Sequence, residues 1–190
     1  IYTVKETTAP TNYGLNTNTF TADLEFAGQV VQIQVTDPSI TTGVTIKKTG
    51  YQQVMNNSLI RYTVSNVANT SSVSLNSFYW RDTIPTDAMR LTRLVTGTYS
   101  ATQNYKVTYT TNLNSNWQTA YDNLSTAQNY TLDMSASALG LASNEYVTSF
   151  MLVFGIVPSG FHQLTDATVD GTTLYALTNG YQFTNKADVG

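Results

Sequence analysis

The stretch Phe78-Tyr79-Trp80-Arg81-Asp82 decides the fold class, because the apolar Phe78 and Trp80 alternate along it with the more polar Tyr79 and Arg81. Successive side chains of a β-strand point to opposite faces, so the period of two predicts a strand with Phe78, Trp80 and Asp82 facing inward. The same period recurs along the chain between clusters of Asn, Gly, Ser and Pro, and no segment has a sustained apolar repeat of 3.6 residues. The sequence therefore predicts an all-β protein.

Two further stretches alternate in the same way, and each ends its apolar face on a polar group. They are Val44-Thr45-Ile46-Lys47-Lys48, with Val44, Ile46 and Lys48 inward, and Tyr181-Gln182-Phe183-Thr184-Asn185, with Tyr181, Phe183 and Asn185 inward. An amine, an acid and an amide are thus expected to face the core. Burial of a Lys or an Asp costs several kcal/mol unless the group is paired, so three such groups need a chemical reason to converge.

About eight strands are expected over residues 41–190. They are Val44–Lys48, Leu59–Val67, Val73–Asp82, Arg90–Thr98, Tyr105–Thr111, Tyr130–Met134, Val147–Phe154 and Tyr181–Asn185. Strands of this number and spacing favour a two-sheet sandwich of the Ig-like or prealbumin-like kind. Trp117–Leu124 and Ala136–Ala142 are the segments that could carry short helical turns, and neither is long enough to change the class.

Residues 1–40 form a separate block, because Asp37-Pro38 and the Thr-rich stretch that follows have the composition of a linker. Alternation predicts a first strand from Tyr2 to Glu6 and a hairpin that joins Phe20–Phe26 to Val30–Val35. About 40 residues are too few for an independent core. The block is therefore expected to dock on the sandwich or to be the remnant of a larger domain.

The composition excludes several classes of protein. Of the 190 residues 41% are hydrophobic and 11% are charged, which excludes a disordered chain. The net charge is −3 and the nine Lys and Arg are scattered singly, so no nucleic-acid partner is expected. No apolar run approaches the ~20 residues of a transmembrane helix, and no signal peptide is recognised. The chain has no Cys, and its wealth of Thr, Asn and Tyr favours a secreted β-protein.

Lys48, Asp82 and Asn185 suggest a self-directed reaction. Desolvation lowers the pKa of a Lys and raises the pKa of an Asp, so a neutral amine and a protonated acid can coexist in an aromatic-lined core. The Lys48 amine can then attack the Asn185 side-chain carbonyl while Asp82 relays protons and ammonia leaves. The resulting internal amide would close a loop of about 138 residues and contribute about 5 kcal/mol by the loop-entropy model.

Other interpretations of these residues stay open at this point. Lys48 can extend its amine to solvent, and Asp82 can simply open a turn before Thr83-Ile84-Pro85. A register slip of one residue would make Lys47 the nucleophile. Glu145 is a second candidate for the assisting acid.

The region from about residue 42 to about residue 188 resembles the repeated Cna A-type/DUF11-like sandwich domains of Gram-positive surface adhesins and pilins. The resemblance rests on Val44-Thr-Ile-Lys-Lys-Thr-Gly50, Ile60-Arg-Tyr-Thr-Val64, Phe78-Tyr-Trp-Arg-Asp-Thr-Ile-Pro85 and Phe183-Thr-Asn-Lys-Ala187. In that family a Lys on the first strand bonds an Asn on the last strand with the help of an acid. The resemblance assigns these roles to Lys48, Asn185 and Asp82, and it is weak between about residues 112 and 145.

The block of residues 1–40 is similar to the C-terminal part of Cna B-type, SpaA-like domains. The similarity lies in Tyr2-Thr-Val-Lys-Glu6-Thr-Thr-Ala-Pro10-Thr-Asn-Tyr13-Gly-Leu15, where Asn12 replaces the usual Gly. It implies that Glu6 is the assisting acid and that Asp37 is the acceptor of a second cross-link. The Lys of that cross-link would lie on a strand before residue 1, and Lys5 points away from Glu6. The exposed sheet edge could pair with another chain.

The expected function is that of a structural stalk or spacer in a cell-wall-anchored surface adhesin or pilus-like protein. No turnover of a substrate, no cofactor and no metal is expected, and the partners are neighbouring domains of the same extracellular protein. The alternative is a ligand-binding adhesin domain that recognises a host glycan or matrix protein with the loops around Trp117. A hydrolase is the third class, but the lone His162 and an expected turn at Asp166–Gly171 give it little support.

Overall fold

The computed structural model describes all residues from Ile1 to Gly190, and the chain divides into two compact units. The first unit is Ile1–Thr42 and the second is Gly43–Gly190. The division falls close to the boundary expected near residue 40. The two units differ in burial, because every side chain that is buried in the apolar core belongs to the second unit.

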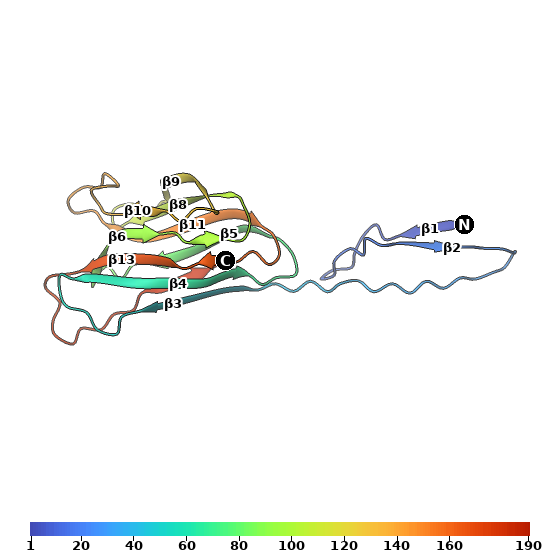
Figure 1. Cartoon of the computed structure of the whole chain (residues 1–190), viewed down its shortest axis with the longest axis horizontal. Helices are drawn as coiled ribbons and strands as arrows, with labels where there is room; N and C mark the ends of the chain where they lie inside the picture. The colour runs from blue at the N-terminus through green and yellow to red at the C-terminus, as the bar shows by residue number, and fades with distance from the viewer. The chain divides into compact units, whose positions relative to one another are not determined.

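The second unit is a β-sandwich of two five-stranded antiparallel sheets (Figure 1). The first sheet has the order β10 (Thr131–Asp133), β6 (Met89–Val95), β13 (Ala167–Thr173), β4 (Leu59–Asn69) and β3 (Val44–Gly50). The second sheet has the order β14 (Lys186–Val189), β5 (Leu75–Thr83), β11 (Val147–Val157), β8 (Asn104–Thr111) and β9 (Gln118–Ser125). A short ladder joins β7 (Thr98–Tyr99) to β12 (Gln163–Thr165). The expected all-β, two-sheet sandwich is confirmed, and its arrangement is consistent with an Ig-like fold.

The alternating stretches bury the faces that the sequence predicts. In β5 the side chains of Phe78, Trp80 and Asp82 are all fully buried, whereas Tyr79 and Arg81 between them are not. The Trp80 ring meets Phe150 of β11 edge to face at 5.6 Å, and its Nε1 donates a 2.9 Å hydrogen bond to the Tyr99 hydroxyl. The indole therefore fills the core without leaving its polar atom unpaired.

The centre of the first sheet is β13, where the sequence predicted a turn at Asp166–Gly171. That prediction was wrong, because the turn-forming residues Asp170 and Gly171 pair with both neighbouring strands, β4 and β6. A Cβ atom on Gly171 would lie 2.6 Å from the carbonyl oxygen of Arg90, so the close approach of β6 admits only glycine here. The alternation of Ala167 and Val169, both fully buried, was the signal that could have revealed the strand.

Two other local predictions differ from the structure. Trp117–Leu124 was one of the two segments that could carry short helical turns, but most of it belongs to β9, which satisfies its backbone groups by pairing with β8. Tyr181–Asn185 was expected to be the last strand, but β14 begins only at Lys186. The reason is that β14 pairs with β5, and β5 ends at Thr83, opposite Lys186. Ala136–Ala142 does form hydrogen-bonded turns without a helix.

The first unit contains one two-stranded sheet of β1 (Tyr2–Lys5) and β2 (Thr19–Ala22). The expected hairpin with Val30–Val35 is wrong, because that segment forms no strand and β2 pairs with β1 instead. All four side chains of β1 are exposed. This unit thus lacks the buried face on which a strand register depends.

Candidate functional site

The candidate site lies where the first and last strands of the sandwich meet. Lys48 belongs to β3 at the edge of the first sheet, Asp82 to β5 of the second sheet, and Asn185 directly precedes β14 at the edge of the second sheet. The edge strands β3 and β14 lie against each other. Ala187 stands opposite Asp82 in the β14–β5 ladder, which brings Asn185 to the same end of β5. The structure thus gathers the three polar groups that the sequence assigned to the core.

Lys48 and Asp82 form a buried ion pair through Lys48 Nζ and Asp82 Oδ2. The Asp82 side chain is 0% exposed and the Lys48 side chain 10%. The interpretation of Lys48 as a lysine that extends to solvent is therefore wrong, as is that of Asp82 as a turn residue. Lys47 is exposed and its backbone pairs with Ser65, so it does not share this environment.

An aromatic ring covers the Lys48 amine. Lys48 Nζ lies 4.8 Å from the centroid of the Tyr62 ring, a cation–π distance. Tyr62 can take this position because Gly50 has no side chain, since a Cβ there would lie 2.4 Å from the ring. Gly50 and Tyr62 thus help to shield the amine from solvent.

The amide of Asn185 is the unsatisfied member of the site. Its Oδ1 and Nδ2 are both buried, and neither has a hydrogen-bond partner of regular geometry; the same holds for Asp82 Oδ1. The Asn185 side chain nevertheless lies close enough to Asp82 to exert a small lowering effect on the pKa of that carboxyl. A buried amide without partners costs stability, so the position of Asn185 beside the ion pair calls for an explanation.

Burial shifts both members of the ion pair toward their neutral forms. It raises the pKa of the Asp82 carboxyl, and the opposing effect of Lys48 does not cancel the shift. It lowers the pKa of the Lys48 amine, and Asp82 opposes this shift without cancelling it. Burial also raises the pKa of Tyr62 to about 12, so the ring that covers the amine stays un-ionised at neutral pH. A proton shared between Lys48 and Asp82 can then rest on the acid and leave a nucleophilic amine.

The other residues that the sequence singled out lie elsewhere. Glu145 accepts a 2.6 Å hydrogen bond from Thr111 Oγ1 and is not part of the site. His162 is exposed, and its Nδ1 is 2.8 Å from the carbonyl oxygen of Gly160. Trp117 is 41% exposed next to β9.

In the first unit, Asn16 connects Glu6 to the segment that contains Asp37. The Glu6 carboxylate accepts a 2.6 Å hydrogen bond from the Asn16 backbone, and the Asn16 side chain donates a 3.0 Å bond to the carbonyl oxygen of Thr36. Asn16 thus links Glu6 to the residue before Asp37. No lysine pairs with either acid among the ion pairs of the structure.

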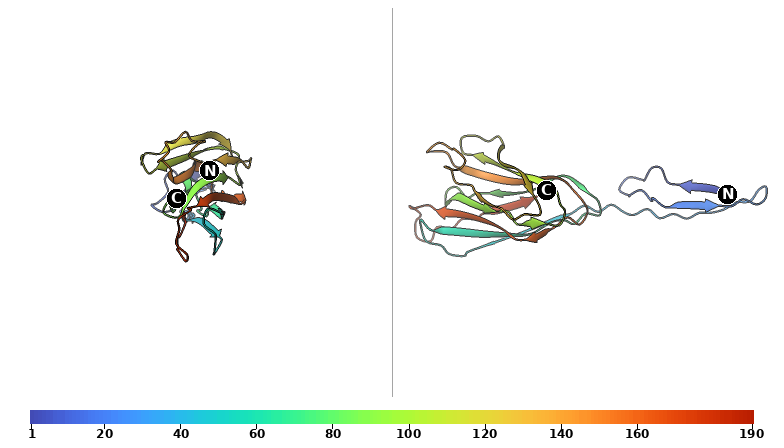
Figure 2. Two further views of the ribbon diagram at one scale, coloured as in Figure 1. Left: turned by 90° about the vertical axis from the view of Figure 1, so that its left-hand side faces the viewer. Right: turned by 45° about the horizontal axis from the view of Figure 1, so that its top comes forward.

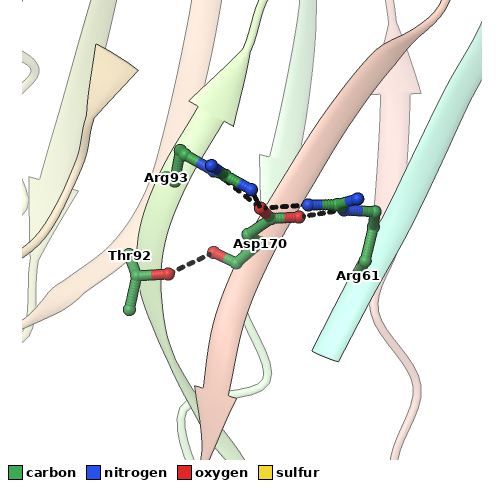
Figure 3. A network of polar contacts seen from close by, with 4 residues as sticks. All are labelled: Arg61, Thr92, Arg93 and Asp170. Carbon is green, nitrogen blue, oxygen red and sulfur yellow. Dashed lines mark hydrogen bonds and ion pairs between the residues drawn. The ribbon is translucent and has the colours of Figure 1, made fainter. Parts of the chain in front are cut away.

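The sequence did not reveal a second buried acid, Asp170. Figure 3 shows its carboxylate between Arg61 of β4 and Arg93 of β6, the residues opposite it in the two neighbouring strands. Arg61 donates bonds of 2.7 and 2.9 Å, and Arg93 Nε donates one of 2.8 Å. We call these three residues the Asp170 network. Both carboxylate oxygens of Asp170 accept hydrogen bonds in this network, in contrast to the unsatisfied amide of Asn185 at the candidate site.

The structure has no group of three or more His, Cys, Asp or Glu residues that could hold a metal ion. The structure also contains no helix with the length and apolar character needed to cross a membrane. Comparisons with protein-family models, curated proteins and solved structures found no match.

Proposed function

We propose that the sandwich is a structural stalk module that stabilises itself with an isopeptide bond between Lys48 and Asn185. The observation that carries the proposal is the buried, unsatisfied Asn185 amide beside a buried Lys48–Asp82 pair whose pKa shifts favour the neutral forms. A reaction that joins the two groups leaves one neutral secondary amide, which removes the Lys48 charge and the NH2 group of Asn185 from the core.

The proposed reaction balances without a co-reactant. The Lys48 amine attacks the Asn185 side-chain carbonyl carbon, and protonated Asp82 donates its proton toward the carbonyl oxygen. Asp82 then transfers a proton from the former Lys48 amine to the leaving nitrogen. The carbon–nitrogen bond of the Asn185 amide breaks as the carbonyl group re-forms, and its oxygen returns the first proton to Asp82. Ammonia leaves, and a secondary amide joins the two side chains. The chemistry acts once on the protein itself.

The position of the bond suits a module that transmits force. Lys48 lies in the first strand of the sandwich and Asn185 adjoins the last, and these strands are the edges of different sheets. Tension applied at the two ends of the unit would pass through the cross-link instead of peeling hydrogen bonds from the strands between. Forced unfolding is governed by the unfolding rate, which such a bond would slow.

We assign the module to an extracellular, cell-wall-anchored adhesin or pilus-like protein, with neighbouring domains as its partners. Support comes from the cysteine-free, Thr-rich composition and from the resemblance to surface-protein domains. Residues 1–40 would then be the C-terminal part of a second, Cna B-type domain. In that domain Glu6 would be the assisting acid and Asp37 the acceptor of a cross-link to a lysine on another strand.

The intact mass of the denatured protein tests the cross-link. A formed bond lowers the mass by one ammonia, about 17 Da below the value calculated from the sequence. The deficit should vanish in Lys48→Ala and in Asp82→Ala. It should persist in Lys47→Ala, the matched control for an adjacent lysine. A wild-type mass equal to the calculated one would refute the proposal.

A further inference from the structure

A groove opens between the two loops that adjoin the candidate site. One wall is the connection from β3 to β4, residues 51–58, and the other is the connection from β13 to β14, residues 174–185. In the left view of Figure 2 these loops project side by side from the sandwich. The cavity volume is about 840 Å³, within the range of about 300–1,000 Å³ that is typical of small-molecule sites.

Hydrogen bonds between the loops hold the groove open in a defined shape. Asn56 Nδ2 donates to the carbonyl oxygens of Tyr175 and Leu177 at 3.2 and 2.7 Å. The turn at Thr178–Tyr181 closes with a 3.0 Å backbone bond, and Gly180 supplies its positive φ of 81°. The two walls are thus tied to each other, which lowers the entropy that a ligand would have to overcome.

Aromatic rings form one part of the lining. Tyr181 and Phe183 stack with their ring centroids 6.5 Å apart and their planes at 29°. Tyr51, which is 61% exposed, lines the groove from the other loop, and the buried Tyr62 also belongs to the lining. Exposed aromatic faces of this kind offer flat apolar surfaces with a polar hydroxyl at the rim.

Neutral amides form the other part of the lining. Gln52 and Gln53 contribute from the first wall, and Asn179 and Gln182 from the second. Each amide both donates and accepts hydrogen bonds, as a hydroxyl group does. None of the residues that line the groove is charged. The lining is therefore matched to a ligand that combines apolar faces with many neutral hydroxyl groups.

We propose that this groove binds a neutral oligosaccharide. Sugar rings present C–H faces to the aromatic side chains and hydroxyl groups to the amides, whereas an anionic glycan would find no cationic side chain in the lining. The one acid hydrogen-bonded to a lining residue is Asp87, which accepts from the Tyr181 hydroxyl. Glycoside hydrolysis requires a pair of carboxyl groups. No carboxyl group is part of the lining and Asp87 beside Tyr181 is a single acid, so the groove lacks such a pair and binds sugar without cleaving it. The binding chemistry does not depend on the Lys48–Asn185 bond, although that bond would join the two walls at their base.

The test is binding of the full chain to a panel of lactose, maltotriose, cellotriose, chitotriose and xylotriose, measured by saturation-transfer NMR and calorimetry. At least one of these neutral sugars should bind, and a uronic-acid disaccharide should not. Tyr181→Ala and Tyr51→Ala should each weaken binding by about tenfold or more. Both rings are largely exposed, so thermal unfolding should confirm that the variants keep the fold.

Trp117→Ala is the matched control, because Trp117 is an exposed aromatic residue that does not line the groove. It should change the affinity by less than about twofold. Absence of binding to every neutral sugar at millimolar concentration would overturn the proposal. So would binding that survives both tyrosine substitutions, or binding that is lost with Trp117. Preferred binding of the uronic-acid disaccharide would show that the ligand is anionic and would also overturn it.

Discussion

Replacement of Asn185 by alanine separates a bonded site from an unbonded one more sharply than any other substitution. In the unbonded protein Asn185 Oδ1 and Nδ2 make no regular hydrogen bond, so Asn185→Ala removes none. Loss of a buried, unsatisfied amide is then nearly neutral or slightly stabilising. The Lys48–Asp82 pair also keeps both of its members, so no buried charge is left alone.

If the bond forms, the same substitution removes a covalent closure of about 138 residues, which is worth about 5 kcal/mol by loop entropy. For a unit of this size each kcal/mol corresponds to about 2–4 °C in Tm, so Tm should fall by about 10–20 °C. Calorimetry and urea unfolding of the wild type, of Asn185→Ala and of the exposed-site control Asn144→Ala measure the difference. A fall of less than about 3 °C in Asn185→Ala would refute the reasoning.

Two further predictions concern the first sheet. Asp170→Asn should destabilise the protein by about 2 kcal/mol, because it removes the charge shared by two arginines that are each more than a third exposed and screened by solvent. Burial acts to raise the pKa of the Asp170 carboxyl, but the arginines outweigh it and hold the pKa below the usual value. The contribution of the Asp170 network to stability is therefore full above about pH 4 and is lost as the pH falls through the lowered pKa. Urea unfolding should show a large loss of stability in Asp170→Asn at pH 7 and a smaller loss at pH 3, with Asp166→Asn as the exposed control. Equal losses at both pH values would contradict the assignment. Gly171→Ala should cost about 1–3 kcal/mol or more, because its Cβ would meet the Arg90 carbonyl oxygen at 2.6 Å. Gly140→Ala, where a Cβ would meet no atom within 4 Å, controls for the loss of glycine in the same unfolding assay, although the positive φ of Gly140 adds some strain.

The site shows how far alternation can be trusted. Lys48 and Asp82 were placed correctly because each ends a run of alternating residues, and side-chain direction along a strand depends only on position. Asn185 was placed through a strand that does not exist, since β14 begins one residue later. Its amide is buried because the pairing of β14 with β5 brings Asn185 to the same end of β5 as Asp82. Local periodicity does not contain that information.

The Asp170 network shows the opposite case. The pair Asp170-Gly171 has the local signature of a turn, and the structure makes it the middle of a central strand. Arg61 and Arg93 lie 109 and 77 residues away in the sequence, so their pairing with Asp170 depends on strand register across the sheet. No property of the residues near Asp170 predicts those partners.

The sequence alone determined the all-β class, the inward faces of β3 and β5, and the two polar groups on them, because these follow from the period of side chains along one strand. The tertiary structure alone decided which strands are neighbours, that Lys48 rather than Lys47 meets Asp82, and that two distant loops enclose a groove without charge. The physical reason is that strand pairing and loop proximity arise from contacts between segments far apart in the chain, and their free energy depends on all of the partners at once.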